Sequence, residues 1–140
     1  MGCLAVWDQR ALKQTVVRGY AGALGRFRRP LNLVAPLGRW PLLPPPGTAL
    51  SSCYLSHRAI DGEEPTVFAA LLRALYNRAL LRHASYLVIG FAAGDPLSSV
   101  LAGYRTFPYL SELHLAAWED GEAAVSEIDG RLPSPEIAVL

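Results

Sequence analysis

Four consecutive stretches of the chain decide the fold: LSSCYLSHRAI (50–60), DGEEP (61–65), TVFAALLRALYNRALLRHA (66–84) and YLVIGF (86–91). The first is predicted to be part of a long strand over 49–60, and the last, apolar without alternation, a strand buried on both faces. The third predicts a helix with a core-facing stripe of Phe68, Leu71, Leu72, Leu75 and Ala79. A strand, a helix and a parallel strand together form a βαβ unit.

Two helix starts can be read from residue types. Asp61 and Glu64 have the spacing of a capping box, and Pro65 is tolerated in the first turn of the helix that follows. Asp95 and Pro96 predict the N-cap and first position of a second, shorter helix that ends near residue 103.

The remaining segments predict further strands and loops. Apolar and β-branched residues in 2–8 and 14–20 predict a hairpin within residues 1–20. Residues 19–35 predict one or two short helices, which Pro30 interrupts, and the proline-rich residues 36–48 predict a loop. The last two expected strands are 113–118 and 135–140, antiparallel to each other and joined by an acidic loop.

The fold class expected from this order is α/β (α+β), with a mixed, mostly antiparallel central sheet of about six strands that contains the βαβ unit. A length of 140 residues suits one domain. We therefore expect a single domain over 1–140, with a hairpin in 1–20, a loop in 36–48 and the core in 49–140.

The composition is that of a globular protein, with 51% hydrophobic and 18% charged residues. No apolar run is long enough to span a membrane and no basic leader precedes an apolar run, so the expected location is the cytoplasm, with no membrane partner. Cys3 and Cys53 are expected to be buried free thiols. The histidines and cysteines have no metal-ligand spacing, so no metal is expected.

Charge is distributed unevenly, although the net charge is only +1. Residues 9–60 hold eight basic and no acidic side chains, whereas residues 112–140 hold seven acidic side chains and one basic. Such asymmetry can indicate a surface for nucleic acid or an anionic membrane. The interpretation we favour is that the two ends meet in the fold and pair, because only Arg26, Arg28 and Arg29 are tightly grouped.

His57 is the one residue whose chemistry suggests catalysis directly, because an imidazole can act as a general base near neutral pH. Adjacent residues of a regular strand point to opposite faces, so Ser56 and His57 are not expected to form a catalytic pair. The alternative for His57 is a hydrogen-bonded histidine beneath the helix layer.

The element order from residue 49 onward, with GCLAVWDQRALKQTVVRGY (2–20), YLSHRAIDG (54–62) and DGRLPSPEIAVL (129–140), resembles the GNAT superfamily of N-acetyltransferases. It is most similar to the C-terminal half of bacterial proteins with two GNAT-like units. Nearly the whole chain is covered, but the first strand and helices of the family are lacking. The resemblance implies that the chain is part of a longer protein.

The resemblance implies where acetyl-CoA or another acyl-CoA would bind. The central strand, with Leu55 and Ser56, would contact the pantetheine arm, and Asp95 corresponds to the start of the family's later helix. The phosphate turn of the family is Gln/Arg-x-x-Gly-x-Gly/Ala, whereas residues 61–67 retain only Gly62 of its glycines, with Thr66 offering a hydroxyl. The expected position of the tyrosine that protonates the thiolate falls at Ala102, and Tyr104 is the nearest substitute.

Three functions follow as hypotheses. The one we favour is a GNAT-like domain of the acyl-CoA-dependent N-acyltransferase class whose pyrophosphate turn has degenerated, so that it is weakly active or inactive and pairs with another domain or protomer. The alternatives are an active N-acetyltransferase for an unknown amine, with His57 and Tyr104 as catalytic residues, and a basic binding module. The expected partner is a second copy or a missing N-terminal domain of the same protein, not nucleic acid.

Overall fold

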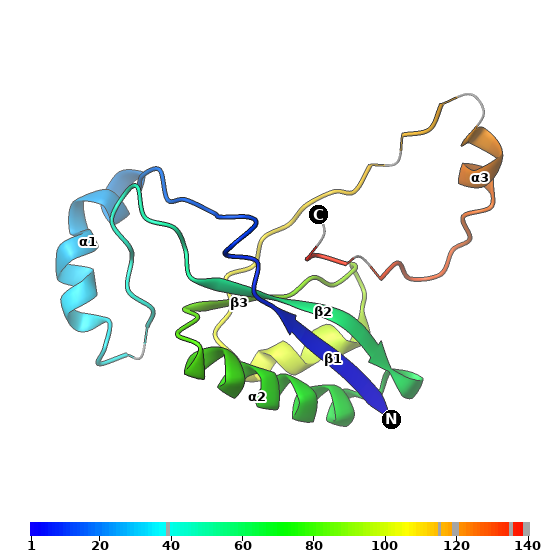
Figure 1. Ribbon diagram of the computed structural model, residues 1–140, viewed down its shortest axis with the longest axis horizontal. Coiled ribbons are helices and arrows are strands. Elements are labelled where there is room, and N and C mark those ends of the chain that lie inside the picture. Colours follow the sequence, from blue (N-terminus) through cyan, green and yellow to red (C-terminus); the bar gives the residue numbers. More distant parts are fainter. Residues whose placement is uncertain (39, 115, 119–120, 135, 139–140) are drawn as a thin grey trace.

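The βαβ unit is the centre of the computed structural model, which describes residues 1–38, 40–114, 116–118, 121–134 and 136–138 (Figure 1). Strand β2 (Ser52–Ile60) leads through a short 3₁₀ turn, η1 (Asp61–Glu63), into helix α2 (Pro65–Leu81), and then into β3 (Tyr86–Val88). β2 and β3 pair in parallel, with Ser52 opposite Tyr86 and Tyr54 opposite Val88. The predicted βαβ unit is confirmed, although β3 is shorter than expected.

β1 (Gly2–Trp7) pairs antiparallel with β2 on the other side, so the sheet order is β1-β2-β3. The expected partner of β1 was the segment 14–20, and that prediction is wrong. This segment makes only an isolated bridge between Val16 and Ala49. The nine-residue β2 offers partners along the whole of β1, and α2 packs on both strands, so this distant pairing is favoured over the local hairpin.

The expected sheet of about six strands is therefore corrected to three strands in a small α+β fold. Residues 113, 114 and 116–118 form no strand, because no other described residues cover this part of the chain. Tyr109 and Leu110 are each 90% exposed, and Trp118 is 86% exposed. The expected strand 135–140 lies partly outside the described residues, and 136–138 are not in a strand.

The core lies between α2 and the sheet. Leu55, Phe68, Leu72 and Leu97 form its main cluster, and Phe68 is completely buried and packs edge-on against Phe91 at a ring distance of 5.9 Å. The stripe predicted for α2 is confirmed, with Phe68, Leu72 and Ala79 buried and Leu71 and Leu75 half-buried.

Both cysteines are free. Cys53 is buried, and this burial raises the pKa of its thiol. Cys3 was also expected to be buried, but it is exposed.

Two shorter helices follow β3 in the sequence. The 3₁₀ helix η2 (Pro96–Gly103) begins as predicted, with Asp95 as its N-cap. Helix α3 (Glu122–Ser126) lies on the long arc that leads to the C-terminus (Figure 1). No helix in the described ranges is both long and apolar enough to cross a membrane.

Helix α1 (Gly22–Val34) is one continuous helix, although one or two short helices were expected, and it continues through Pro30. It has no buried residue and lies apart from the sheet, beside the loop that follows it (Figure 1). Asn32 holds that loop through two hydrogen bonds with the backbone of Leu43, at 2.8 and 2.9 Å.

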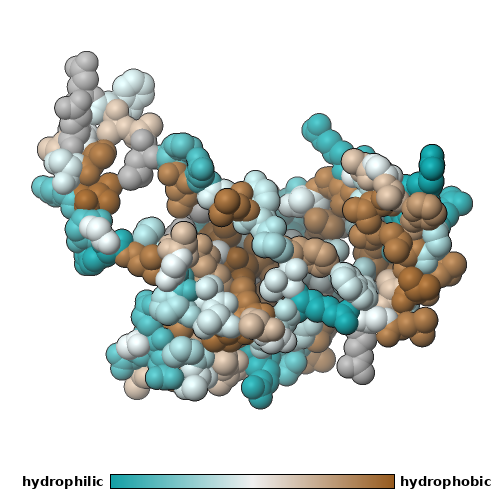
Figure 2. All heavy atoms as spheres, turned by 180° about the vertical axis from the view of Figure 1, so that it is seen from behind, coloured by the Kyte–Doolittle hydropathy of each residue, from teal (hydrophilic) through white to brown (hydrophobic). Residues whose placement is uncertain are grey.

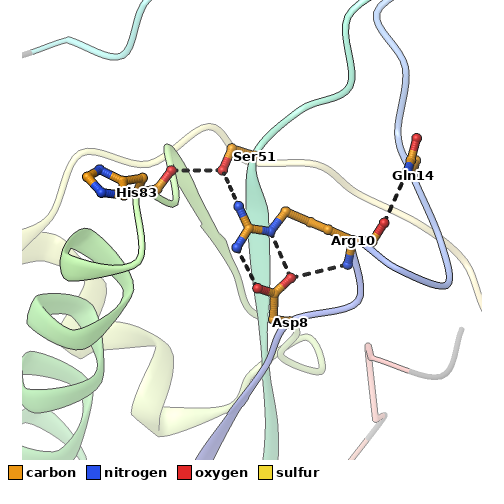
Figure 3. Close-up of polar contacts among 5 residues, drawn as sticks. All are labelled: Asp8, Arg10, Gln14, Ser51 and His83. Carbon is orange, nitrogen blue, oxygen red and sulfur yellow. Dashed lines mark hydrogen bonds and ion pairs between the residues drawn. The ribbon is translucent and has the colours of Figure 1, made fainter.

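A polar network joins the ends of β1, β2 and α2 (Figure 3). Arg10 binds Asp8 through Nε and Nη2, at 2.8 and 2.5 Å, and its Nη1 donates to Ser51 Oγ at 3.2 Å. Ser51 Oγ in turn donates to the carbonyl oxygen of His83 at 2.8 Å. The hydrogen bonds from Arg10 lower the pKa of Asp8 to about 2.

Candidate functional site

A β-bulge interrupts the pairing of β1 with β2. The partners change from Cys3 opposite Ala59 to Ala5 opposite Ser56, so that two residues of β2 lie opposite one residue of β1. His57, the first of those two, has a φ of 52°, in the left-handed region that residues other than glycine seldom adopt. Strained backbone of this kind is concentrated at functional sites, so the bulge is a candidate functional site.

The bulge turns the ring of His57 toward its neighbour. His57 Nδ1 and Ser56 Oγ lie 3.0 Å apart, within hydrogen-bonding distance. The expectation that Ser56 and His57 point to opposite faces of the strand is therefore wrong. It assumed the strict alternation of a regular strand, and a left-handed residue breaks that alternation.

Both side chains line a small cavity of about 100 Å³ between β2, the residues after β3 and the C-terminal segment. Its wall combines apolar side chains with polar ones; the apolar residues are Leu4, Leu55, Ile89 and Ile137. Gly90 also belongs to the wall, and a Cβ there would lie 3.0 Å from that of Ile137, so a larger residue would push the C-terminal segment away. This volume is below the roughly 300–1,000 Å³ of pockets for drug-sized ligands, so the cavity could enclose only a small chemical group.

Glu136 connects the C-terminal segment to the bulge. Its Oε2 accepts the backbone N–H of His57 at 2.8 Å, and its Oε1 accepts the N–H of Ala138 at 3.3 Å. The same segment is held a second time, where Gln9 Nε2 donates to the carbonyl oxygen of Ala138. The carboxylate thus supplies a hydrogen-bond acceptor for a backbone N–H within the bulge.

The residue after His57 is also fixed in place. Arg58 Nη2 forms an ion pair of 2.6 Å with Asp95 Oδ2, and its guanidinium lies 5.0 Å from the ring centre of Phe91. Asp95 Oδ1 accepts the N–H of Leu97 at 2.9 Å, and the carboxylate is fully buried. Asp95 was expected at a cofactor site; the structure uses one of its oxygens as a helix cap and the other for a buried cation.

In the turn that was compared with a pyrophosphate site, residues 61–67, the side chain of Glu64 occupies the start of α2. Glu64, and not Asp61, is the N-cap of α2: its Oε1 accepts the N–H of Thr66 at 3.3 Å and the Thr66 hydroxyl at 2.9 Å. Gly62 has a φ of 62° inside η1. The carboxylate occupies the hydrogen-bond donors of the helix start that a phosphate would use.

Tyr104 is at the other end of η2, where it caps the helix and packs against the ring of Tyr76 at 5.6 Å. It is not among the residues that line the cavity. Of the residues expected in a site, the structure therefore brings together Leu55, Ser56 and His57, and places Gly62, Thr66, Asp95 and Tyr104 elsewhere.

Residues that sequence patterns did not single out complete the cavity: Arg58, Ser134 and Glu136. The two C-terminal residues follow β2 by more than seventy positions and carry no local motif that could have identified them. Among the residues that the structure describes, no group of three His, Cys, Asp or Glu side chains could hold a metal ion.

Comparison with family models, curated proteins and solved structures found no match to this chain.

Proposed function

We propose that this chain is a pairing unit of the cytoplasm, which associates with a second copy of itself, and that it is not by itself an acyl-CoA-dependent N-acyltransferase. The observation that carries the proposal is its surface area. The chain exposes 10,700 Å², whereas a compact monomer of 15.2 kDa exposes about 7,100 Å². The excess is larger than the area that an obligate dimer interface takes from one partner, roughly 1,000–2,500 Å².

Part of that excess is an unpartnered apolar stripe on α1. Leu24, Phe27, Leu31 and Val34 recur at helical spacing and are between 39% and 55% exposed. Brown hydrophobic atoms lie open on the surface at the α1 end of the molecule (Figure 2). An amphipathic helix whose apolar stripe contacts no core is stable only when another surface covers it.

The charge distribution favours a second copy as the occupant. Arg26 and Arg29 on α1 are exposed, and they form no ion pair with any residue that the structure describes. Helix α3 lies at the opposite end of the molecule from α1 (Figure 1). The acidic residues Glu112, Glu127 and Asp129, before and after α3 in the sequence, are exposed; Glu112 lies 3.7 Å from His114, and Asp129 pairs with Arg131 at 2.6 Å. The expected pairing of the two ends within one chain is not found among the described ion pairs. Two antiparallel copies would place each basic helix beside the other copy's acidic arc.

The test is the oligomeric state of matched variants, measured by sedimentation equilibrium over a wide range of protein concentration. Leu33 is on the same helix and is 81% exposed, but it lies about 180° around the axis from Leu24. We expect the wild type and Leu33→Lys to be dimers and Leu31→Lys to be a monomer. A monomeric wild type, or equal dissociation of both variants, contradicts the proposal.

Titration calorimetry with acetyl-CoA tests the enzymatic alternative. We expect no binding, because Glu64 occupies the start of α2 and Asp61 and Glu63 add negative charge beside it. Binding that Thr66→Ala weakens would restore the acyltransferase hypothesis.

A further inference from the structure

We propose that the cavity beside the bulge is an acyl-transfer site, in which Ser56 Oγ is the nucleophile, His57 is its general base and the substrate is an ester of a short-chain carboxylic acid. This activity goes beyond the pairing function and does not depend on it.

The first support is the geometry of the two groups. A hydroxyl becomes a useful nucleophile when a base lies within hydrogen-bonding distance, and Ser56 Oγ and His57 Nδ1 are 3.0 Å apart. In the tautomer with its proton on Nε2, the ring leaves Nδ1 free to accept the hydroxyl proton. His57 makes this contact from a backbone with a φ of 52°, a conformation in which glycine would be less strained.

The second support is the arrangement around the pair. Glu136 accepts the backbone N–H of His57 and so holds the bulge in the conformation that directs the ring toward Ser56. Glu136 is thus a positioning residue, because it acts through His57.

The third support is a cation in the cavity wall. Arg58 Nη2 is held by Asp95, whereas Nη1 has no hydrogen-bond partner among the described residues. Asp95 balances the charge of Arg58, so what Arg58 can offer is the unpartnered Nη1 N–H, a hydrogen-bond donor for the negative carbonyl oxygen that develops during acyl transfer.

The lining indicates the class of substrate. Leu4, Leu55, Ile89 and Ile137 supply apolar surface for an acyl chain beside the polar pair. The cavity of about 100 Å³ is small, so only an acyl group of about acetyl size would fit inside it, and the alcohol part of the ester would lie outside.

The reaction balances without any cofactor. Ser56 Oγ attacks the ester carbonyl carbon while its proton passes to His57 Nδ1. The bond from that carbon to the alcohol oxygen breaks, and the alcohol leaves with the proton from His57, which leaves an acyl-serine. Water then attacks this ester, His57 takes a proton from the water, and Ser56 Oγ departs with that proton. The sum is ester plus water giving acid plus alcohol.

The experiment uses the full chain with p-nitrophenyl acetate as substrate and a fluorophosphonate as a probe for activated serines. We expect the probe to modify Ser56 of the wild type, located by peptide mass mapping, at least tenfold faster than Ser99, an exposed serine outside the cavity. Labelling of the unmodified chain decides the proposal whether or not a variant folds. Equal labelling of the two serines overturns it.

Variants locate the base. Asparagine tolerates the left-handed conformation but cannot act as a base, so His57→Asn is expected to reduce ester hydrolysis at least tenfold. His83→Asn is the matched control, since His83 has a φ of 57° and does not line the cavity. Ser56→Ala is expected to abolish both hydrolysis and labelling, and circular dichroism checks that each variant folds. Unchanged hydrolysis in a folded His57→Asn or Ser56→Ala overturns the proposal.

Discussion

Replacing His83 by glycine is expected to stabilise the protein, because His83 occupies a position that glycine suits better. α2 ends in a Schellman motif, in which the N–H of Ala84 donates to the carbonyl oxygen of Ala79 at 3.0 Å and the N–H of His83 donates to that of Leu80 at 2.9 Å. This motif requires a left-handed backbone at the residue that follows the C-cap. That residue is His83, which has a φ of 57°. The helix expected over 66–84 thus ends earlier, at Leu81, with Arg82 as its C-cap and His83 beyond it.

The magnitude follows from two opposing terms. An L-residue in the left-handed region is strained by about 1–2 kcal/mol, and glycine loses about 0.5–1 kcal/mol more backbone entropy on folding, so the net gain is about 0.5–1 kcal/mol. The His83 ring makes no hydrogen bond or ion pair with any residue that the structure describes, so its removal loses little. The bond from Ser51 reaches the backbone carbonyl oxygen of residue 83 and remains in the variant (Figure 3).

Urea unfolding followed by circular dichroism measures this gain, which corresponds to roughly 2–4 °C in Tm for a chain of this size. His83→Ala is the control, because alanine loses the ring but keeps the strain, and it is expected to change stability by less than about 0.5 kcal/mol. A gain of equal size in both variants, or no gain in His83→Gly, would refute the reasoning.

Three further predictions concern the core, the ion pair after β1 and the helix cap. Phe68→Ala is expected to lower the free energy of unfolding by about 3–5 kcal/mol, because Phe68 is fully buried. Phe107→Ala is the control: Phe107 is 66% exposed, so the expected loss is less than about 1 kcal/mol. The midpoints of urea unfolding compare the two variants. The pKa of Asp8 is lowered from 3.8 to about 2, so its pairing with Arg10 stabilises the protein above pH 3.8 and is lost as the pH falls through 2. The stability difference between wild type and Arg10→Met should therefore shrink over that interval in acid titrations, and a constant difference would argue against the pair. Glu64→Ala is expected to cost about 0.5–1 kcal/mol by removing the N-cap of α2, whereas Glu64→Asp should keep most of the stability; equal losses would show that the cap contributes nothing.

The elements that could be predicted from the sequence are those set by local chemistry. Five apolar positions at helical spacing in α2 correctly indicated which of its faces is buried. Asp95 followed by Pro96 correctly marked the start of η2, because an N-cap needs only a side chain that reaches the N–H two residues on.

The predictions that failed depended on which distant segments meet. The hairpin of residues 2–8 with 14–20 was inferred from nearness in sequence, but β1 pairs with β2, more than forty residues further along the chain. Residues 113–118 were predicted to be a strand from composition, but a strand needs a partner edge and a covering layer, and the described structure provides neither.

The sequence by itself determined the βαβ unit and the residue types around its first strand, because helix periodicity, caps and buried strands are properties of short segments. Only the tertiary structure decided the candidate site. The bulge arises where β1 and β2 pair out of step, and Glu136 reaches His57 from the far end of the chain. Both are long-range packing effects, so no local pattern indicates that Ser56 and His57 are in contact.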